Sequence, residues 1–199
     1  MKNQRRRGLR RRVACTSGQA LLEFALIVPL VLVLALGVIE VGYALLDQHV
    51  VTKLAREGSN LISRDTSLAD AATAMRNMSS RPVDFNNGSS TVIFSVVKNV
   101  ATVGANNYNK PVLYQRYVYG SLPGSSVLNN SGGTFGSAPE FQALNSDSDT
   151  SLQITNLPAT TSLGGFLYIT EIYTRHPLIT PFDRFGIQVP QTLYSIAYF

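Results

Sequence analysis

Apolar residues run almost unbroken from residue 24 to residue 46. No charged residue lies between Phe24 and Ile39, and the stretch continues past Glu40 to Leu46, 23 residues in all. As a helix this stretch would measure about 34 Å, which is enough to cross a hydrocarbon core of about 30 Å. The pattern therefore predicts a transmembrane helix near the start of the chain.

The helical pattern continues beyond this stretch but becomes amphipathic. Apolar residues recur at helix-like spacing through residues 46–63, which predicts that the membrane helix extends outward with one apolar face. Gly58 is a candidate interruption or cap of this extension. A short helix is expected over Ser67–Met78, with Ser67 as its N-cap. Its apolar face would consist of Leu68, Ala71, Ala72 and Met75.

The second half of the chain has the composition of β-strands. Segments rich in β-branched and aromatic residues are bounded by Gly, Pro, Asn and Ser. They predict an antiparallel sheet of four to five strands, and residues 120–150 form a long polar loop between the second and third of them. The fold class is therefore α+β. The expected strands are residues 91–97, 112–119, 152–155, 166–174 and 192–198.

Basic residues at the start of the chain predict its orientation. Positive charge resists translocation across a membrane, so this cluster should stay in the cytoplasm while the part after the helix is exported to the periplasm. The orientation signal consists of Arg5, Arg6, Arg7, Arg10, Arg11 and Arg12.

This cluster also explains the net charge of +5. From Gln19 onward there are ten basic and twelve acidic residues, a net charge of −2. Nucleic-acid binding is therefore not expected. We predict four regions: a cytoplasmic leader (1–18), a transmembrane helix (19–46), a helical stalk (47–80) and a β-rich domain (81–199).

Two residues interrupt the apolar segment near its start. Glu23 is an acid at the cytoplasmic edge of the helix, where it needs a partner or a purpose, because an ionised carboxylate at mid-bilayer costs on the order of 2.5 to 3.5 kcal/mol. The alternative is that Glu23 stays solvated at the headgroup boundary. Pro29 lacks an N–H group, so a kink or a melted turn is expected there.

The order of residues around these two resembles a known export signal. Gly18 lies five residues before Glu23, basic residues precede it and an apolar helix follows, as in the class III signal of type IV pilins and pseudopilins. Residues 18–30 read GQALLEFALIVPL, and their combination of Glu23-Phe24 with Pro29 closely resembles the TadE-like family of minor pseudopilins from tight-adherence (type IVc) pilus systems. Residues 53–59 are similar to the A-x-R-E-G segment of this family, and residues 168–181 to its C-terminal strand and Pro-containing loop.

The resemblance implies a pilin-like fold and cleavage by prepilin peptidase between Gly18 and Gln19. Glu23 would then be the fifth residue of the mature chain, and in pilins this acid is thought to pair with the N-terminal amine of a neighbouring subunit. Phe24 and Pro29 belong to the same processing and assembly segment. The implied partners are prepilin peptidase, other pilins or pseudopilins bound through the helix, the inner-membrane pilus assembly platform and the lipid bilayer.

Two functions follow as hypotheses. The first is a minor pseudopilin, anchored in the inner membrane, that supports biogenesis or initiation of a tight-adherence (Flp-type) pilus used in surface adhesion. The alternative is a membrane-anchored periplasmic enzyme or binding protein with an uncleaved signal anchor.

Residues suited to catalysis or metal binding are sparse after the helix. His49 and His176 are the only histidines, and we expect an interfacial surface position for His49 and the end of a strand for His176. Asp147 and Asp149 resemble the start of a calcium loop but lack its Gly and terminal Glu. We therefore predict no enzyme activity, no catalytic residues, no metal site and no cofactor.

The strand tyrosines offer a sugar-binding or adhesive face as one interpretation, and half-buried sheet aromatics as the other. They are Tyr114, Tyr117, Tyr119, Tyr168, Tyr173, Tyr194 and Tyr198.

Overall fold

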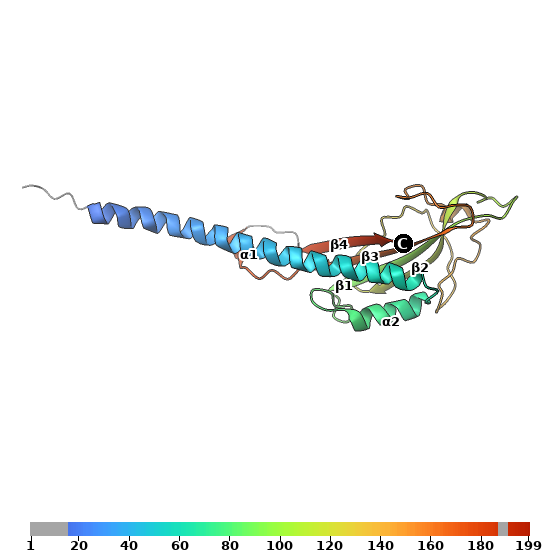
Figure 1. The fold of residues 1–199 in the computed structure, drawn as a ribbon, viewed down its shortest axis with the longest axis horizontal. Helices are drawn as coiled ribbons and strands as arrows, with labels where there is room; N and C mark the ends of the chain where they lie inside the picture. Colours follow the sequence, from blue (N-terminus) through green and yellow to red (C-terminus); the bar gives the residue numbers. More distant parts are fainter. Residues whose placement is uncertain (1–15, 187–190) are drawn as a thin grey trace, which may run out of the picture. The chain divides into compact units, whose positions relative to one another are not determined.

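The computed structural model describes residues 16–186 and 191–199, and the predicted basic orientation signal lies outside these residues. The chain divides into two compact units with the boundary between Val41 and Gly42. In the second unit the end of the first helix lies along a sheet, together with a second helix and long connections (Figure 1). The α+β class predicted from the sequence is confirmed.

Helix α1 spans Thr16–Ile62 and contains Pro29 within it. The helix continues through Pro29, so no melted turn forms there, and the kink that was predicted as the alternative stays a prediction. Proline removes one N–H and displaces one carbonyl of the preceding turn. The hydrogen bonds on either side are sufficient to maintain the helix through Pro29.

The sheet has four strands in the order β2-β1-β3-β4, and every neighbouring pair is antiparallel. β1 is an inner strand with eight buried residues in succession, because both of its faces are covered. The strand bounds are β1 Ser90–Asn99, β2 Pro111–Gly120, β3 Phe166–Arg175 and β4 Thr192–Tyr198.

The fifth predicted strand, residues 152–155, does not form. The 3-10 helix η1 occupies Thr150–Leu152, and a single isolated bridge joins Gln153 to Val112 of β2. Leu152 and Ile154 are buried. The segment is therefore apolar because it packs on the core, although it does not extend the sheet.

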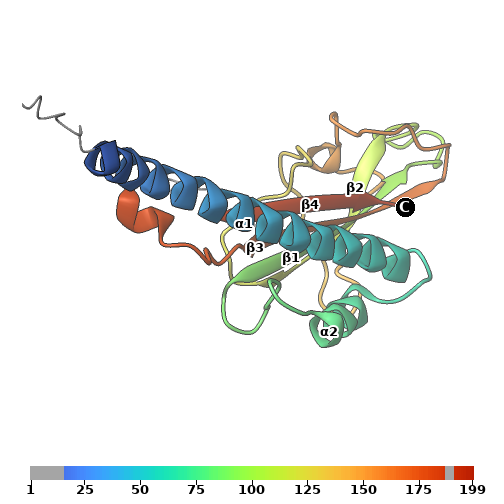
Figure 2. The same cartoon turned by 60° about the vertical axis from the view of Figure 1, so that its left-hand side comes forward.

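One face of the sheet is covered by the end of α1 and by α2, which spans Leu68–Met78 (Figure 2). Ser67 is the N-cap, and its hydroxyl oxygen accepts a hydrogen bond from the Asp70 amide at 3.1 Å. The predicted cap and bounds of this helix are confirmed. Its buried residues are those expected: Leu68, Ala71, Ala72 and Met75.

The amphipathic extension of α1 is also confirmed, but its buried face begins later than expected. Val51, Leu54, Ala55 and Ile62 are buried, whereas Leu46 is 62 % exposed. The face that packs on the sheet therefore starts about one turn after the apolar segment ends.

Gly58 neither interrupts nor caps α1. A Cβ atom at this position would lie 2.7 Å from Cγ2 of Thr170 in β3 and 3.2 Å from the terminal carbon of Met75 in α2. Glycine is therefore needed at this point because three elements approach closely, a reason the local sequence does not show.

Replacing Gly58 by alanine should lower the free energy of unfolding by about 1 kcal/mol, because overpacking typically costs about 1 to 3 kcal/mol while alanine gains about 1 kcal/mol in helix propensity. Gly42→Ala is the matched control, because a Cβ atom there meets nothing within 4 Å. Denaturant unfolding of the full chain in detergent measures both. Equal stability of the two variants would contradict the close approach at Gly58.

The opposite face of the sheet is covered by the connection between β2 and β3. Leu128, Ala143, Leu152 and Ile154 from this connection pack against strand residues in a second hydrophobic cluster. Bridges Gln115↔Gln142 and Phe135↔Ala143 also fasten it. The long polar loop predicted over 120–150 is thus a covering layer with its own buried residues.

Candidate functional site

The apolar surface of the first unit is the largest exposed chemical feature of the described chain. Leu21, Phe24, Leu26 and Val38 are 66 to 74 % exposed, and their apolar neighbours are also exposed. Among the described residues, one helix (Gly18–Ile62) is long and apolar enough to cross a membrane. Because the apolar part of this helix is almost entirely unburied, the helix differs from the core helix of a soluble protein.

The predicted cleavage position lies in the first turn of α1. A Cβ atom on Gly18 would meet nothing within 4 Å, so no side chain of residues 16–186 or 191–199 covers this position. The amide groups of a first helical turn have no partner within the helix. The Gly18-Gln19 peptide is therefore accessible on the described surface.

Glu23 lies one turn after Gln19 and on the same side of the helix. The Gln19 side-chain amide donates a hydrogen bond to Oε1 of Glu23 at 3.0 Å, and both side chains are exposed. The structure therefore brings Gln19 and Glu23 together. Residues four apart on a helix are neighbours, so an amine created at Gln19 by cleavage would lie within one turn of this carboxylate.

Phe24 and Pro29 lie on the same exposed helix, and Phe24 is 66 % exposed. Among the described residues, no contact of Phe24 or Pro29 with Glu23 is recorded. Their side chains contribute to a continuous apolar surface, which can pack against lipid or against other apolar helices. This surface is suited to processing and assembly. Among the described residues, no general base or nucleophile is found beside it.

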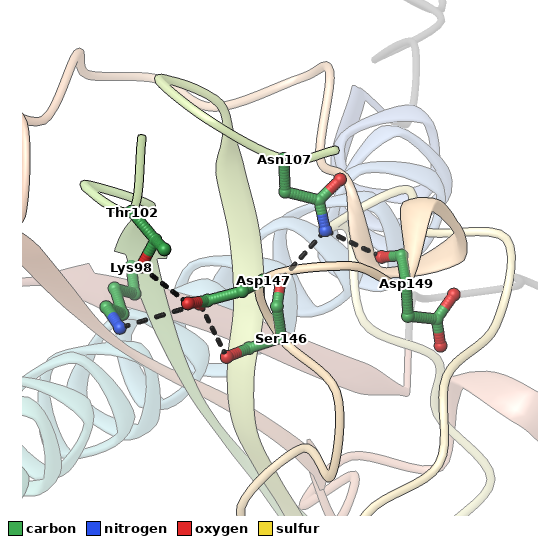
Figure 3. Close-up of polar contacts among 6 residues, drawn as sticks. All are labelled: Lys98, Thr102, Asn107, Ser146, Asp147 and Asp149. Carbon is green, nitrogen blue, oxygen red and sulfur yellow. Dashed lines mark hydrogen bonds and ion pairs between the residues drawn. The ribbon is translucent and has the colours of Figure 1, made fainter. Parts of the chain in front are cut away.

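Asp147 and Asp149 serve to fasten the loop and do not converge (Figure 3). The Thr102 hydroxyl donates to Asp147 Oδ2 at 2.6 Å, and Lys98 Nζ lies 3.9 Å from Oδ1. Asp149 accepts from the Ser151 amide at 2.9 Å and caps η1. No group of three or more His, Cys, Asp or Glu side chains that could hold a metal ion occurs in the described residues.

The Asp147 carboxylate should make the loop sensitive to acid. The hydrogen bond from Thr102 lowers the pKa of Asp147 below its usual 3.8; burial opposes this effect, and Lys98 and Ser146 lower the pKa further. Since the folded-state pKa is depressed, the stabilisation is present above pH 3.8 and is lost as the pH falls through the folded-state pKa. The Asn107 amide, which donates to the Asp147 carbonyl, should then exchange faster. An identical acid response in Asp147→Asn would contradict this role.

The two histidines have different environments. His49 is exposed on α1, where the prediction placed it. His176 follows directly after β3, as predicted, and is only 2 % exposed. Its Nδ1 lies 2.6 Å from Oδ2 of Asp47 on α1, 129 residues away in sequence. The sequence analysis missed this pair, which tethers the end of β3 to α1.

The strand tyrosines are mainly half-buried, which supports the second interpretation. Tyr114, Tyr117, Tyr119 and Tyr168 pack against the core between the sheet and the helices. Tyr173 donates its hydroxyl to the Ser125 carbonyl at 2.7 Å. Burial raises the pKa of Tyr194, and the nearby Glu171 carboxylate raises it further. Tyr198, at 41 % exposure, is the most accessible of the strand tyrosines and does not form a face by itself.

The other feature missed from the sequence is a buried carboxylate, Glu171, which Ser126 links to the half-buried Arg116 on the sheet face that the β2–β3 connection covers. Glu171 in the middle of β3 is fully buried and accepts hydrogen bonds from Ser126 Oγ, the Val127 amide and the Tyr194 hydroxyl. Arg116 of β2 donates to Ser126 Oγ at 3.1 Å. Burial lowers the pKa of Arg116, and Glu171 opposes this effect. The sequence does offer one sign of this buried acid, because Glu171 is the one charged residue within the strand segment 166–174.

The comparisons with known proteins bear on α1. The family model described as TadE-like protein matches residues 18–60. Neither the comparison with curated proteins nor that with solved structures found a match. The resemblance in residues 168–181 lies outside the matched segment and stays a prediction. The match includes Gly18, Glu23 and residues 53–59, and it confirms that this part of the chain resembles the TadE-like family of pilus-associated proteins.

Proposed function

We propose that this protein is a minor pseudopilin of a tight-adherence pilus system, cut after Gly18 by prepilin peptidase and anchored in the bacterial inner membrane by α1. The observation that carries the proposal is the exposed Gly18, Gln19 and Glu23 array at the start of an exposed apolar helix, within the segment that matches the TadE-like family. The resemblance to the TadE-like family supports an association with a pilus. The accessible backbone at Gly18 and the Glu23 carboxylate, one turn after Gln19, support processing and assembly.

The charge on Glu23 gives this array an assembly role. Cleavage after Gly18 creates an amine at Gln19, and opposite charges held about 4 Å apart attract by about 4 kcal/mol at an effective dielectric near 20. Among the described residues, the recorded partner of Glu23 is the neutral side chain of Gln19, and no ion pair of Glu23 is found. The pairing of Glu23 with the Gln19 amine of a neighbouring subunit would therefore fix the register of two packed helices.

Deletion of the gene tests the proposed role in pilus biogenesis. A strain without this protein should lose sheared surface pili and adhesion, and the unchanged chain should restore both. Gly18→Val should fail to restore them, because a branched side chain at the cleavage position blocks the approach of the peptidase to the backbone. Val38→Ala, an exposed position on the same helix, is the control. Full piliation in the deletion strain would contradict the proposal.

The alternative is a membrane-anchored periplasmic enzyme or binding protein with an uncleaved anchor. Under that alternative, Gly18→Val would leave the activity of the chain intact, since the anchor would serve only to retain it. The complementation experiment therefore separates the two functions.

A further inference from the structure

Asp47 and His176, which both belong to the second unit, are in contact at one end of that unit. Asp47 follows Leu46, the last residue of the predicted membrane segment, and its carboxylate lies 2.6 Å from Nδ1 of the buried His176. The Gln48 side chain also donates to the Tyr194 carbonyl at 3.0 Å, near the start of β4. The connection that leaves β3 therefore begins beside the first residues after the apolar segment.

Exposed apolar residues on α1 mark the same end of this unit. Tyr43, Leu45 and Leu46 belong to the second unit and are 47, 66 and 62 % exposed. Such a band requires lipid or another apolar partner, and aromatic residues such as Tyr43 favour the interface between membrane and water. In a chain anchored by α1, the headgroup layer would therefore lie near Asp47.

The surface beside Asp47 carries positive charge and apolar side chains. Arg81 and Arg175 are exposed and line one hollow together with Pro177 and Leu178, and neighbouring Ile179 is 54 % exposed. Among the described residues, neither guanidinium forms an ion pair. These residues, which we call the Arg81–Ile179 patch, combine the two chemistries of a bilayer surface.

The acids close to this patch already have partners. Asp84, in the same hollow, accepts hydrogen bonds from the Asn86 amide at 2.8 Å and from Asn87. Asp47 is engaged by His176. Since neither guanidinium of Arg81 and Arg175 forms an ion pair with these acids among the described residues, both can bind an anion, and guanidinium is well suited to phosphate.

We propose that the Arg81–Ile179 patch docks on the surface of the bilayer that holds α1, with Arg81 and Arg175 on the phosphates of anionic phospholipids and Ile179 at the acyl boundary. This inference rests on the proposed membrane anchoring and adds a second attachment of the exported domain.

A single tryptophan tests the position of Ile179. The chain contains no tryptophan, so Ile179→Trp introduces a unique fluorophore into the full chain in nanodiscs. Brominated phospholipids should quench its emission strongly. Val103→Trp is the matched control, because Val103 is 82 % exposed in the β1–β2 connection, at the end of β1 opposite to the one that pairs with Thr174. A ten-residue strand separates the two ends by about 30 Å, so the control should show no quenching.

Charge variants test the chemistry of the contact. In nanodiscs of anionic lipid, Arg81→Gln with Arg175→Gln should lower the ratio of docked to undocked domain by about 30-fold. Arg64→Gln with Lys110→Gln removes the same charge from exposed positions away from the patch and should leave that ratio unchanged. Replacing the anionic lipid by neutral lipid should lower the ratio of docked to undocked domain for the unchanged chain as well.

The outcomes separate the two levels of the proposal. A chain that does not enter nanodiscs would overturn the membrane anchor and, with it, this inference. A chain that enters them but gives equal quenching at positions 179 and 103 would overturn the docking alone. Quenching at 179 that is indifferent to the two arginines and to lipid charge would overturn the recognition of anionic phospholipid.

Discussion

Replacing Glu171 by alanine is expected to lower the free energy of unfolding by about 3 kcal/mol, because a buried polar group that loses its hydrogen-bond partner costs about 1 to 3 kcal/mol and Glu171 accepts three hydrogen bonds. The change would leave the Val127 amide and the Tyr194 hydroxyl without their acceptor, which lies 2.9 and 3.0 Å away respectively. It would also remove the carboxylate that compensates Arg116 through Ser126. Urea denaturation of the full chain in detergent measures the loss.

Two further variants show whether the hydrogen-bond network of Glu171, Ser126 and Arg116 causes this loss of stability. Glu140→Ala removes an exposed acid and should change the free energy of unfolding by no more than about 0.5 kcal/mol. Glu171→Gln combined with Arg116→Met should be less destabilising than the sum of the single changes, because the two residues belong to one network. A loss for Glu171→Ala as small as that for Glu140→Ala would contradict the assigned role of the network.

Replacing Glu23 by alanine should leave membrane insertion intact and reduce assembled pili by at least about tenfold, since a charge pair of about 4 kcal/mol exceeds the 1.4 kcal/mol that corresponds to a factor of ten. Quantification of sheared pili and of membrane-inserted protein measures the two effects separately.

The choice of replacement separates charge from shape at this position. Glu23→Gln retains size and hydrogen-bonding capacity toward Gln19 but removes the charge, so it should fail like Glu23→Ala, whereas Glu23→Asp should retain part of the activity. Glu57→Gln, an exposed acid farther along α1, should assemble normally. Unchanged piliation in Glu23→Gln would remove the assembly role of the charge.

Elements whose cause is local could be predicted from the sequence. Helix α2 is the clearest case, because its cap at Ser67 and its apolar face are all encoded within a dozen residues. The bounds of β4 match the predicted strand for the same reason, since β-branched and aromatic residues alternate between Gln191 and the end of the chain.

Features that depend on distant residues could not be predicted. Gly58 appeared to be a break in the helix because Thr170 and Met75, which require its small size, are not visible in the local sequence. Residues 152–155 have the composition of a strand, yet β2 offers them only one bridge and Thr150–Leu152 turns into η1. The pairing of Asp47 with His176 joins residues 129 positions apart.

The candidate site is the part of the molecule in which sequence carries most of the information. Gly18, Gln19 and Glu23 lie on one exposed helix, so helical geometry alone brings residues four apart into contact. The structure adds the accessibility of Gly18 and the hydrogen bond from Gln19. The identity of a neighbouring subunit depends on a second chain, and neither spacing nor burial in this chain encodes it.

The N-terminal residue of the protein extracted from membranes tests the central claim most directly. In cells with an active prepilin peptidase, N-terminal sequencing and intact-mass measurement should find a chain that begins at Gln19 and lacks the basic leader. The same cells without the peptidase should yield the uncut chain. A membrane form that begins at Met1 while the peptidase is active would contradict the account.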